Sequence, residues 1–589
     1  MQARLLTALV AGSALLGCAG APASTPVSQP AAVAAGPDGV VPLPVVTLPR
    51  AHKPQPTSAA ISAKDLMTRL YIYADDSMQG REAGTMGNVK ATNYIASEIA
   101  RMGLEPAGDN GTYFQTIPVA TRRLDAASSF VVNGAPLTLF TDWVSTGAGD
   151  AHLTSVPVIF GGTLGDSSSL ITAEQAKDKL VVLAVPGGIA SLRSLRRAPS
   201  ELEDAAGVAI AILDEYPPAA LNRIKEPRMF LNDNPAERPT GQASLLISTG
   251  AGEAIFGKPL SALTPGTAGP TASLAVSYTT APVKDPARNV VGIIRGSDPA
   301  LRGEYVAVGA HNDHIGFSNR PVDHDSIRIW NHTVRPEGAD DGGKQASPEQ
   351  QERVNRQLAE FRATHPGSQR LDSISNGADD DGSGTVTVLE LAQKIAAMKT
   401  KPKRSILFVW HVGEEKGLWG SHYFTDHPTV PRDSIVAQLN MDMVGRGEAY
   451  DETGRTKDGT PIHGNPNYLQ LVGSRRLSTE LGDMVETVNR DGGHHMDLDY
   501  SIDADGHPSR IYCRSDHYEY ARYGIPIVFF TTGLHSDYHQ VTDEPQYIEY
   551  DHMARIANFL EDLAVQVADM DHRPVVDKPK PDPNGRCVQ

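Results

Sequence analysis

Five side chains in the second half of this 589-residue chain are of types that bind divalent metal ions. Together they supply two imidazoles and three carboxylates: His311, Asp380, Glu415, Asp442 and His539. Such a set suits two zinc-like ions that share one carboxylate. Because bound divalent ions polarise carbonyl groups and acidify water, the set predicts metal-assisted hydrolysis.

Strands are the elements expected to position these residues. Apolar runs in the second half read as strands at 305–308, 405–410, 436–439 and 526–530. They alternate with helical patterns, which indicates a largely parallel sheet flanked by helices. His311, Glu415 and Asp442 come just after three of these runs. Ligands of open α/β sheets bind at the carboxyl ends of strands, so this placement favours a functional site.

Two predicted ligands have neighbours with a candidate role of their own. Asp313 lies two residues after His311, where a carboxylate could hold the second ring nitrogen of the imidazole. Glu414 precedes Glu415 in a glycine-rich loop and could act as a general base on metal-bound water. His314 is the rival donor near His311, and we expect it at the rim of the site.

Asp380 lies in the segment Gly-Ala-Asp-Asp-Asp-Gly-Ser-Gly, before a helix predicted over 385–398. One of its three carboxylates is expected to bind a cation, and the others can accept hydrogen bonds from helix amides. A similar Gly-Ala-Asp-Asp segment at 338–341 precedes no strong helix, so it is a much weaker metal-binding candidate.

The last histidine ligand has competitors nearby in the sequence. His535 lies four residues before His539. We favour His539 because it follows the flexible segment 531–534 and the Ser-Asp-Tyr sequence. Ser515 and His517 raise the alternative of a serine hydrolase. No Gly-x-Ser-x-Gly elbow surrounds Ser515, which argues against it.

Composition and charge bound the class of protein. Apolar residues make up 40% and charged residues 21% of the chain, as in an ordinary soluble globular protein. The length predicts two or three domains. The net charge of −17 argues against a nucleic-acid partner, because no basic field exists to replace counterions on phosphate.

The N-terminus carries an export signal. Arg4 is followed by an apolar run, 5–16, that is too short to span a bilayer and fits a signal-peptide core. It ends in a lipobox-like Leu-Leu-Gly-Cys at Cys18, although Leu16 stands where a smaller residue is commoner. We expect an outer-membrane lipoprotein of the bacterial envelope, facing the periplasm or the surface, whose only membrane contact is a lipid on Cys18. Ordinary secretion is the alternative.

Two further cysteines, Cys513 and Cys587, could pair in an oxidising compartment or remain free thiols. The chain is predicted to divide as follows: a signal peptide (1–18), a flexible Pro/Ala-rich linker (19–62), the start of the main domain (63–149), an inserted domain (150–285), the catalytic domain (286–570) and a flexible tail (571–589).

These motifs together resemble the co-catalytic di-zinc aminopeptidase family, in the zinc-exopeptidase superfamily that includes glutamate carboxypeptidase and the transferrin receptor. The resemblance covers roughly 66–120 and 289–565 and includes Gly-Arg-Glu-Ala-Gly-Thr at 80–85. It implies a three-layer α/β/α domain with a mixed, mostly parallel sheet. Residues 150–285 are similar to a protease-associated domain, which implies a smaller β-rich, α+β insertion.

The resemblance also implies a role for each site residue. Asp380 would bridge two Zn²⁺ ions, His311 and Asp442 would complete one, and Glu415 and His539 the other. Asp313 would orient His311. Glu414 would take a proton from the bridging water and deliver it to the leaving amine. Asp516 and Tyr538 resemble positions that contact the substrate or support the ligands. Manganese or cobalt could replace zinc at such ligands.

The predicted activity is that of an aminopeptidase that removes N-terminal residues from peptides. A carboxypeptidase or dipeptidase is the first alternative, with Arg510, Arg514 and Arg522 available to bind a terminal carboxylate. A receptor-like binding protein without catalysis is the second. Side-chain specificity and oligomeric state do not follow from the sequence.

The chain departs from many members of the family in the 69 residues that separate His311 from Asp380. The insert, 318–375, is polar and is expected to lie over the mouth of the site. There it would restrict substrate size or contribute to dimerisation.

Overall fold

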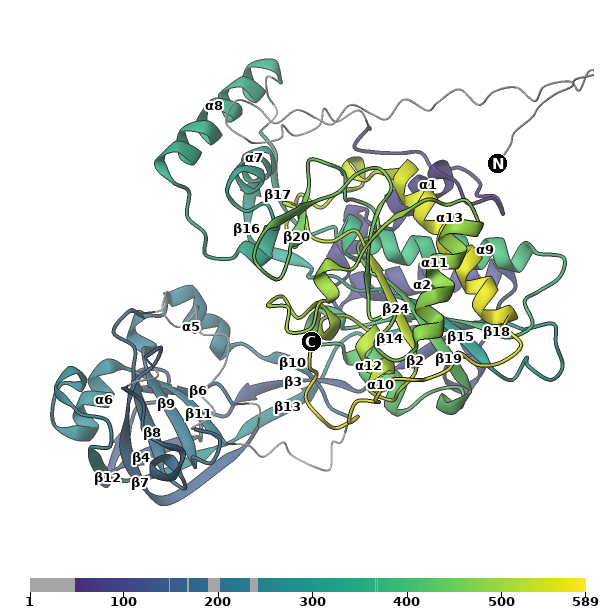
Figure 1. Cartoon of the computed structure of the whole chain (residues 1–589). Coiled ribbons are helices and arrows are strands. Elements are labelled where there is room, and N and C mark those ends of the chain that lie inside the picture. Colours follow the sequence, from purple (N-terminus) through teal and green to yellow (C-terminus); the bar gives the residue numbers. More distant parts are fainter. Residues whose placement is uncertain are drawn as a thin grey trace, which may run out of the picture.

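The computed structural model describes residues 48–589 except 148, 167–168, 189–201, 234–241, 366 and 368. Figure 1 shows a larger unit and a smaller β-rich unit, joined by strands at the lower left of the larger one. The joining strands form a three-stranded antiparallel sheet: β10 (Arg228–Leu231), β3 (Val119–Leu124) and β13 (Tyr278–Pro282). The predicted signal peptide, the Cys18 lipid site and most of the predicted linker lie outside the described residues.

The larger unit is built on a mixed nine-stranded sheet. Its order is β1-β14-β18-β15-β19-β24-β22-β23, with β2 also beside β14. The strands are β1 (Glu105–Pro106), β2 (Phe114–Thr116), β14 (Arg288–Ile294), β15 (Tyr305–His311), β18 (Ser405–His411), β19 (Ile435–Met441), β22 (Tyr468–Val472), β23 (Asp497–Asp499) and β24 (Ile527–Thr531). The central strands β18, β15, β19 and β24 are parallel, and β14, β22 and β23 run the opposite way.

Helices cover both faces of this sheet, because alternate side chains of each strand point to opposite faces. In β18, Phe408 and Trp410 join one buried cluster, and Leu407 and Val409 join another. The first cluster includes α1 (Ala63–Tyr73), α2 (Met86–Met102), α9 (Gly384–Ala397), α11 (Thr479–Asp491) and α13 (Tyr550–Asp569). The second includes α10 (Trp419–Asp426) and α12 (His517–Ala521). The result is the three-layer α/β/α arrangement that the sequence predicted.

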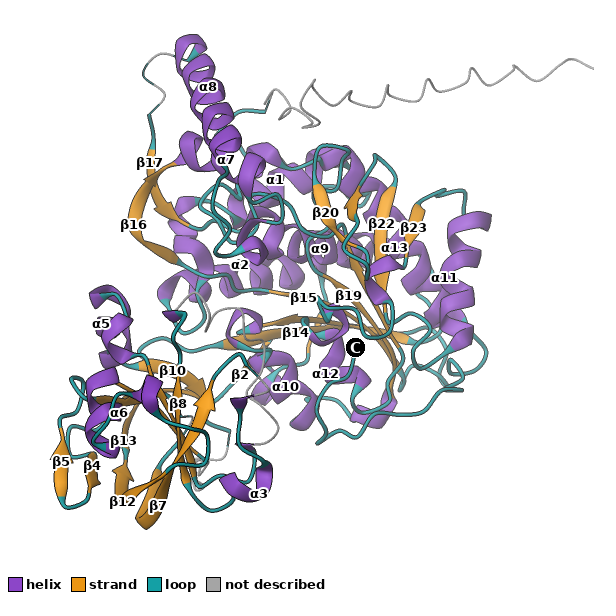
Figure 2. Cartoon of the chain, turned by 60° about the vertical axis from the view of Figure 1, so that its left-hand side comes forward, coloured by secondary structure: helices purple, strands orange, loops and turns teal. Residues whose placement is uncertain are grey.

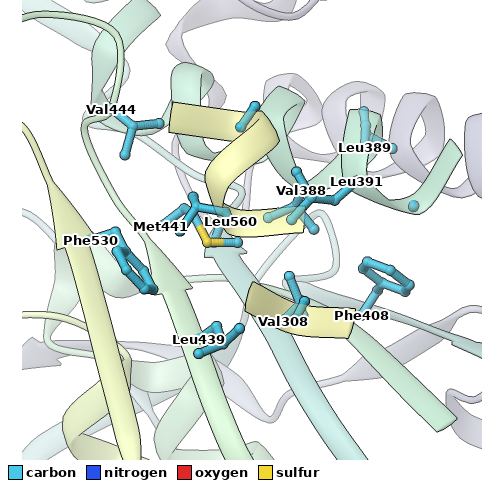
Figure 3. Packing of buried hydrophobic residues seen from close by; sticks show 14 of the residues in the cluster. Val308, Val388, Leu389, Leu391, Phe408, Leu439, Met441, Val444, Phe530 and Leu560 are labelled. Atoms are coloured by element: carbon cyan, nitrogen blue, oxygen red, sulfur yellow. The ribbon is translucent and has the colours of Figure 1, made fainter. Parts of the chain in front are cut away.

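The apolar centre of the first cluster fixes the strands that carry the site. Figure 3 shows Val308, Leu439 and Met441 from the strands beside Val388 and Leu389 of α9. All of these side chains are fully buried. The helix predicted over 385–398 is therefore α9, and its apolar face packs on the strands next to the site.

The smaller unit contains an eight-stranded sheet of order β5-β4-β12-β7-β8-β9-β11-β6. Its strands are β4 (Ser129–Val132), β5 (Ala135–Leu137), β6 (Trp143–Ser145), β7 (Ala151–Thr163), β8 (Leu180–Ala184), β9 (Gly207–Ala211), β11 (Ala243–Ile247) and β12 (Ala268–Val276). Among the residues of this unit that the structure describes, three α-helices accompany the strands: α3 (Ala173–Ala176), α5 (Pro218–Lys225) and α6 (Thr249–Phe256).

The boundary predicted at residue 150 was wrong. Strands β4 to β6 precede it, yet β4 pairs with β12 and β6 pairs with β11 inside the smaller sheet. A hydrophobic core of its own, from Leu124 to Val276, holds this unit together. The second unit therefore begins near residue 125.

The insert predicted at 318–375 folds as a separate substructure beside the site. A two-stranded antiparallel sheet, β16 (Phe317–Asp323) and β17 (Leu371–Ile374), brings its ends together. Between them lie α7 (His324–Val334), a short 3-10 turn at Gly338–Asp341 and α8 (Pro348–Thr364). Figure 2 shows α8 projecting away from the rest of the chain.

The C-terminal tail is packed, so the prediction of a flexible segment from 571 was wrong. Cys587 forms a disulfide with Cys513. The Gln589 side chain is buried and accepts a hydrogen bond from the Tyr512 amide at 2.9 Å. Residues 48–62 also contact the body, since Leu48 packs against the core and the Ser58 amide donates to Asp65 at 3.0 Å.

Among the residues that the structure describes, no helix is both long and apolar enough to cross a bilayer.

Candidate metal centre

The five predicted metal ligands converge at the carboxyl ends of the central parallel strands. His311 is the last residue of β15, and Asp442 directly follows β19. Glu415 lies in the short 3-10 turn Glu414–Lys416 after β18, and Asp380 precedes α9. His539 lies in the loop after β24. Parallel strands deliver their ends to one edge of the sheet, which is why residues so distant in sequence meet here.

The first group of candidate ligands is His311, Asp380 and Asp442. His311 Nε2 lies 3.1 Å from Asp380 Oδ1 and 3.6 Å from Asp442 Oδ1. The His311 imidazole is buried, and among the described residues its Nε2 atom has no hydrogen-bond partner. This nitrogen and the two carboxylates therefore face one small volume.

The second group shares Asp380 with the first. His539 Nε2 lies 3.0 Å from Asp380 Oδ2 and 2.9 Å from Glu415 Oε2. His314 also belongs to it, with Nδ1 2.7 Å from Glu415 Oε1. His314 is fully buried, so the prediction that it lies at the rim was wrong. The second group thus holds four candidate ligands.

These residues fit a pair of divalent ions. Zinc binds nitrogen and oxygen ligands at about 2.0–2.2 Å, so neighbouring ligand atoms of a tetrahedral ion lie about 3.4 Å apart. The separations between the histidine nitrogens and the carboxylate oxygens, 2.9–3.6 Å, are close to that value. Three carboxylates that face one another in a pocket repel each other, and bound cations would offset this repulsion.

Asp380 is positioned by the acidic residues on either side of it. The Asp381 carboxylate accepts hydrogen bonds from the amides of His311 (3.0 Å) and Gly384 (2.9 Å), so it links β15 to the start of α9. The Asp379 carboxylate accepts from the Gly445 amide at 2.7 Å. Asp543 accepts from the Asp380 amide at 3.1 Å. Asp380 faces the two ligand groups while its neighbours bind backbone amides, and of these amides only Gly384 belongs to the helix that the sequence led us to expect.

Asp313 supports the site differently from the prediction. The His311 Nδ1 atom lies 3.1 Å from the backbone carbonyl of Asp313, but 3.7 Å from its carboxylate. The carboxylate instead accepts hydrogen bonds from the amides of Gly413 (2.7 Å) and Glu414 (3.2 Å). Asp313 therefore orients the imidazole through its main chain and fixes the Glu414 turn through its side chain.

Glu414 lines the same pocket as the candidate ligands without belonging to either group. Burial raises the pKa of its carboxyl well above the ordinary value, and the nearby carboxylates of Asp442 and Glu415 raise it further against the opposing effect of His311. A carboxylate with a raised pKa at this place accepts a proton more readily than an ordinary carboxylate does.

Ser515 supports Asp442 and is not part of a serine triad. Its hydroxyl donates to Asp442 Oδ2 at 2.7 Å, while His517 Nε2 bonds to the Tyr512 carbonyl at 2.8 Å. Burial lowers the pKa of His517 to about 3. The serine-hydrolase alternative therefore has no geometric support.

Asp516 is buried and does not line the pocket. Burial raises its pKa to about 7. A group that lies behind the pocket wall is not placed to contact a substrate amine directly. His535, the competitor of His539, is also buried behind the site, with Nε2 3.2 Å from Asp379.

The candidate centre opens into a pocket of about 300 Å³. Its lining includes the apolar residues Met443, Ile502, Ile511, Phe529 and Leu534 beside polar residues such as Thr453, Gln470 and Ser509. Tyr538 also lines it, and the Tyr538 ring stacks on His539 with centroids 4.1 Å apart. The pocket is large enough for one amino-acid side chain beside the predicted ligands.

Of the charged residues that line the pocket, Arg455 was not predicted as a site residue, and Arg514 was named only as one of three arginines that could bind a terminal carboxylate. Arg514 lines the pocket and pairs with Asp340, which lies in the Gly-Ala-Asp-Asp segment at 338–341. Asp340 and Arg514 lie 174 residues apart, so no local pattern could have joined them. Ser515 was considered only as a nucleophile. Its contact with Asp442 also depends on the tertiary structure, so no local pattern could have predicted it.

A mixed α/β sheet with histidines and carboxylates gathered at the carboxyl ends of its central strands is the arrangement expected of a zinc exopeptidase. Residues 364–564 match the family model of peptidase family M28. Four of the five predicted ligands lie within this segment, and His311 precedes it. This segment of the chain is similar to peptidase family M28, in agreement with the family resemblance that the motifs gave.

Curated relatives match about a third of the chain. Leucine aminopeptidase 1 of Coccidioides posadasii is 32% identical over 201 residues, which cover 33% of this chain and 47% of that protein. Leucine aminopeptidase 1 of Arthroderma otae is 28% identical over 196 residues, covering 33% and 48%. The chain spans about half the length of the curated relatives it matches.

Solved structures with an overall likeness include two bacterial aminopeptidases. The aminopeptidase from Aneurinibacillus sp. strain AM-1 has a TM-score of 0.45 and 14% identity, covering 88% of this chain and 97% of that one. The zinc aminopeptidase from Bacillus subtilis has a TM-score of 0.43 and 17% identity, covering 87% and 96%.

Proposed function

We propose that this protein is a zinc-dependent aminopeptidase that removes N-terminal residues from peptides. The observation that carries the proposal is the position of Asp380 between two groups of ligands, beside Glu414 and at the end of a small pocket. His311 and Asp442 would complete one zinc site, and Glu415 and His539 the other. His314 is available to the second site through its Nδ1 atom.

The bound ions would polarise the scissile carbonyl and lower the pKa of water toward about 7. The protein's own residues supply the proton transfers and the alignment. Glu414 accepts a proton in the pocket and returns it to the leaving amine, a role that suits its raised pKa. The Asp313 carboxylate holds the Glu414 amide, so the turn is fixed before substrate arrives.

The pocket supports an exopeptidase with a preference for apolar side chains. Its volume of about 300 Å³ admits one side chain, and Ile502, Phe529 and Leu534 offer it an apolar surface. The matching relatives are leucine aminopeptidases by name, which agrees with this preference.

The test is hydrolysis of matched peptides by the purified, zinc-loaded protein. Peptides with free, N-acetylated and C-amidated termini are compared, with a chelator as control. Chelator-sensitive cleavage that requires a free N-terminus is expected. Cleavage that depends on a free C-terminus would replace this proposal with a carboxypeptidase or dipeptidase.

We further propose that the protein acts in the bacterial cell envelope, held by a lipid on Cys18. The apolar run at 5–16 and the lipobox-like sequence support this proposal. Membrane fractionation of wild type and Cys18→Ser tests it. The wild-type protein is expected in the membrane fraction and the variant in the soluble fraction, whereas equal distribution would contradict the lipid anchor.

A further inference from the structure

Both arginines that line the pocket are paired with carboxylates of the insert. Arg514 forms a two-pronged ion pair with Asp340, at 2.5 Å from Nη1 to Oδ2 and 3.1 Å from Nη2 to Oδ1. Arg455, in β20 (Glu452–Arg455), has its Nε atom 2.8 Å from Glu337 Oε1. The two carboxylates lie three residues apart in one short segment, 337–341, which we call the rim segment.

Backbone contacts hold the rim segment against the pocket. The Ala339 amide donates to the Tyr538 carbonyl at 3.1 Å. Gly338 has a φ of +59°, and a Cβ atom there would lie 2.7 Å from the Tyr538 carbonyl oxygen and 2.8 Å from that of His535. Only glycine permits this approach without displacement of the loop that carries His539. These backbone contacts of the rim segment therefore hold Asp340 in position to pair with Arg514.

Asp340 accounts for the ion pairing of Arg514. Among the described residues, Asp340 is the carboxylate that forms a salt bridge with Arg514. The other polar contact of the Arg514 side chain is with the Tyr538 hydroxyl, at 3.3 Å. Arg455 differs, because Glu452 in its own strand pairs with it as well. Removal of Asp340 would leave Arg514 as a pocket cation without a carboxylate partner.

A planar guanidinium held by two parallel hydrogen bonds is the geometry in which proteins bind a substrate carboxylate. With Asp340 in that position, the same donors are occupied and the positive charge is neutralised. We propose that Asp340 determines specificity by excluding substrate carboxylates from Arg514, so that the pocket accepts uncharged side chains. This inference rests on the proposed aminopeptidase function.

The first test uses Asp340→Asn, which removes the charge and keeps an oxygen acceptor. Hydrolysis of leucyl and glutamyl 4-nitroanilides by the zinc-loaded protein is compared in wild type and variant. The ratio of kcat/KM for the glutamyl to the leucyl substrate is expected to rise on the order of tenfold to a hundredfold, as for a hydrogen bond to a charged group. Asp323→Asn is the matched control, because Asp323 pairs with Arg362 inside the insert. An unchanged ratio in Asp340→Asn, together with an unchanged preference for a substrate with a terminal carboxylate, would overturn the inference.

A double variant shows whether the gain passes through Arg514. Asp340→Asn combined with Arg514→Gln is expected to lose the gain on the glutamyl substrate, since the two residues act as a pair. If the gain persisted without Arg514, the inference would be wrong. Should Asp340→Asn fail to fold, Arg514→Gln alone leaves Asp340 unpaired and is expected to raise lysyl over leucyl hydrolysis. An unchanged lysyl preference would then overturn the inference.

Two sources of carboxylate are separated by a second pair of substrates. Leucyl-glycine carries a terminal carboxylate and leucyl-glycinamide does not, whereas the glutamyl anilide carries its carboxylate on the side chain. A gain in either comparison supports the inference and identifies the carboxylate that Arg514 admits. If neither comparison showed a gain, the inference would be refuted.

Calorimetric binding separates this inference from the proposed function. L-glutamate and L-leucine share amino and carboxyl groups, so the difference in their affinities reports the side chain. If wild type cleaved no aminoacyl substrate, the proposed function would fail. A gain in relative L-glutamate affinity in Asp340→Asn would still support the role of Asp340, and equal relative affinities would overturn it.

Discussion

The proposed role of Glu414 as a general base can be tested directly. Its carboxylate lines the pocket but belongs to neither ligand group, so Glu414→Gln should keep the metal ions and lose the proton transfer. We expect kcat to fall on the order of a hundredfold to ten-thousandfold, the usual contribution of a general base. The measurement is kcat on a leucyl substrate together with bound zinc per chain.

The matched control is Glu105→Gln, on the edge strand β1, where the carboxylate pairs with Arg295 on the surface. It should retain both activity and zinc. Full activity in Glu414→Gln would exclude Glu414 as the base. Loss of zinc would instead indicate that Glu414 binds metal.

Ser515 is predicted to tune metal affinity through Asp442. Its hydroxyl holds Asp442 Oδ2 at 2.7 Å and is itself held by Asn440 at 3.1 Å. Groups that orient a metal ligand in this way contribute about tenfold to a hundredfold in affinity, so Ser515→Ala should weaken zinc binding by that factor. Competition with a chromogenic chelator measures the affinity.

Ser297→Ala serves as the control for Ser515→Ala, because the Ser297 hydroxyl donates to the Lys401 carbonyl outside the pocket. It should bind zinc as wild type does. Equal affinities for wild type and Ser515→Ala would show that Asp442 needs no such support.

At the residue scale, the candidate metal ligands could be predicted from the sequence more accurately than the residues that position them. His311, Glu415 and Asp442 could be predicted because each follows an apolar strand, and strand ends converge. The second role of Asp313, toward the amides of Gly413 and Glu414, depends on a contact across a hundred residues. Local spacing holds no signal for such contacts.

At the scale of elements, the C-terminal tail stabilises the pocket wall. Cys587 is bonded to Cys513, next to Arg514, and the Gln589 side chain reaches the Ile502 carbonyl at 3.3 Å. Ile502 lines the pocket. The disulfide joins residues separated by 74 positions, so it restricts the unfolded chain and should contribute about 2–4 kcal/mol to stability.

The prediction is that Cys587→Ser unfolds at a lower urea concentration than wild type in oxidising buffer. Reductant should lower the wild-type midpoint to that of the variant and leave the variant unchanged. A wild-type midpoint that does not respond to reductant, with the disulfide shown to be reduced, would mean that the crosslink contributes nothing to stability.

Elements of the larger sheet were predicted more accurately than the borders between units. Apolar runs at 405–410 and 436–439 became β18 and β19 because buried parallel strands read as continuous apolar sequence. Strand β4 was assigned to the wrong unit, because its partner β12 lies more than a hundred residues later. Likewise, the tail reads as flexible by composition, and only its disulfide and side-chain contacts order it.

At the scale of the whole molecule, the insert is anchored to the loop that carries His539. Glu544 Oε2 lies 2.7 Å from Arg370 Nη2 and 3.2 Å from His324 Nε2. Arg328 of α7 stacks over the Tyr547 ring at 3.8 Å. Because the rim segment also contacts Tyr538, the insert and the loop that carries His539 form one continuous structure beside the pocket.

We predict that the insert limits the length of peptide that the pocket admits. Its ends are adjacent, since Phe317 pairs with Ile374 and the Ser375 amide donates to the Gly316 carbonyl at 2.9 Å. A short glycine-serine linker can therefore replace 318–373 without separating β15 from Asp380. The ratio of kcat/KM for an uncharged, amidated octapeptide to that for a dipeptide amide should rise severalfold.

The ratio is the decisive quantity, because loss of the Glu544 anchors would weaken zinc binding equally for both peptides. Amidated peptides also remove any effect of exposing Arg514 to a terminal carboxylate. A control variant lacks only the projecting helix α8, 348–364, and keeps the rim segment, so its ratio should match wild type. If deletion of the whole insert left the ratio unchanged, the insert would not limit peptide length, and its contacts would serve to hold the His539 loop in place.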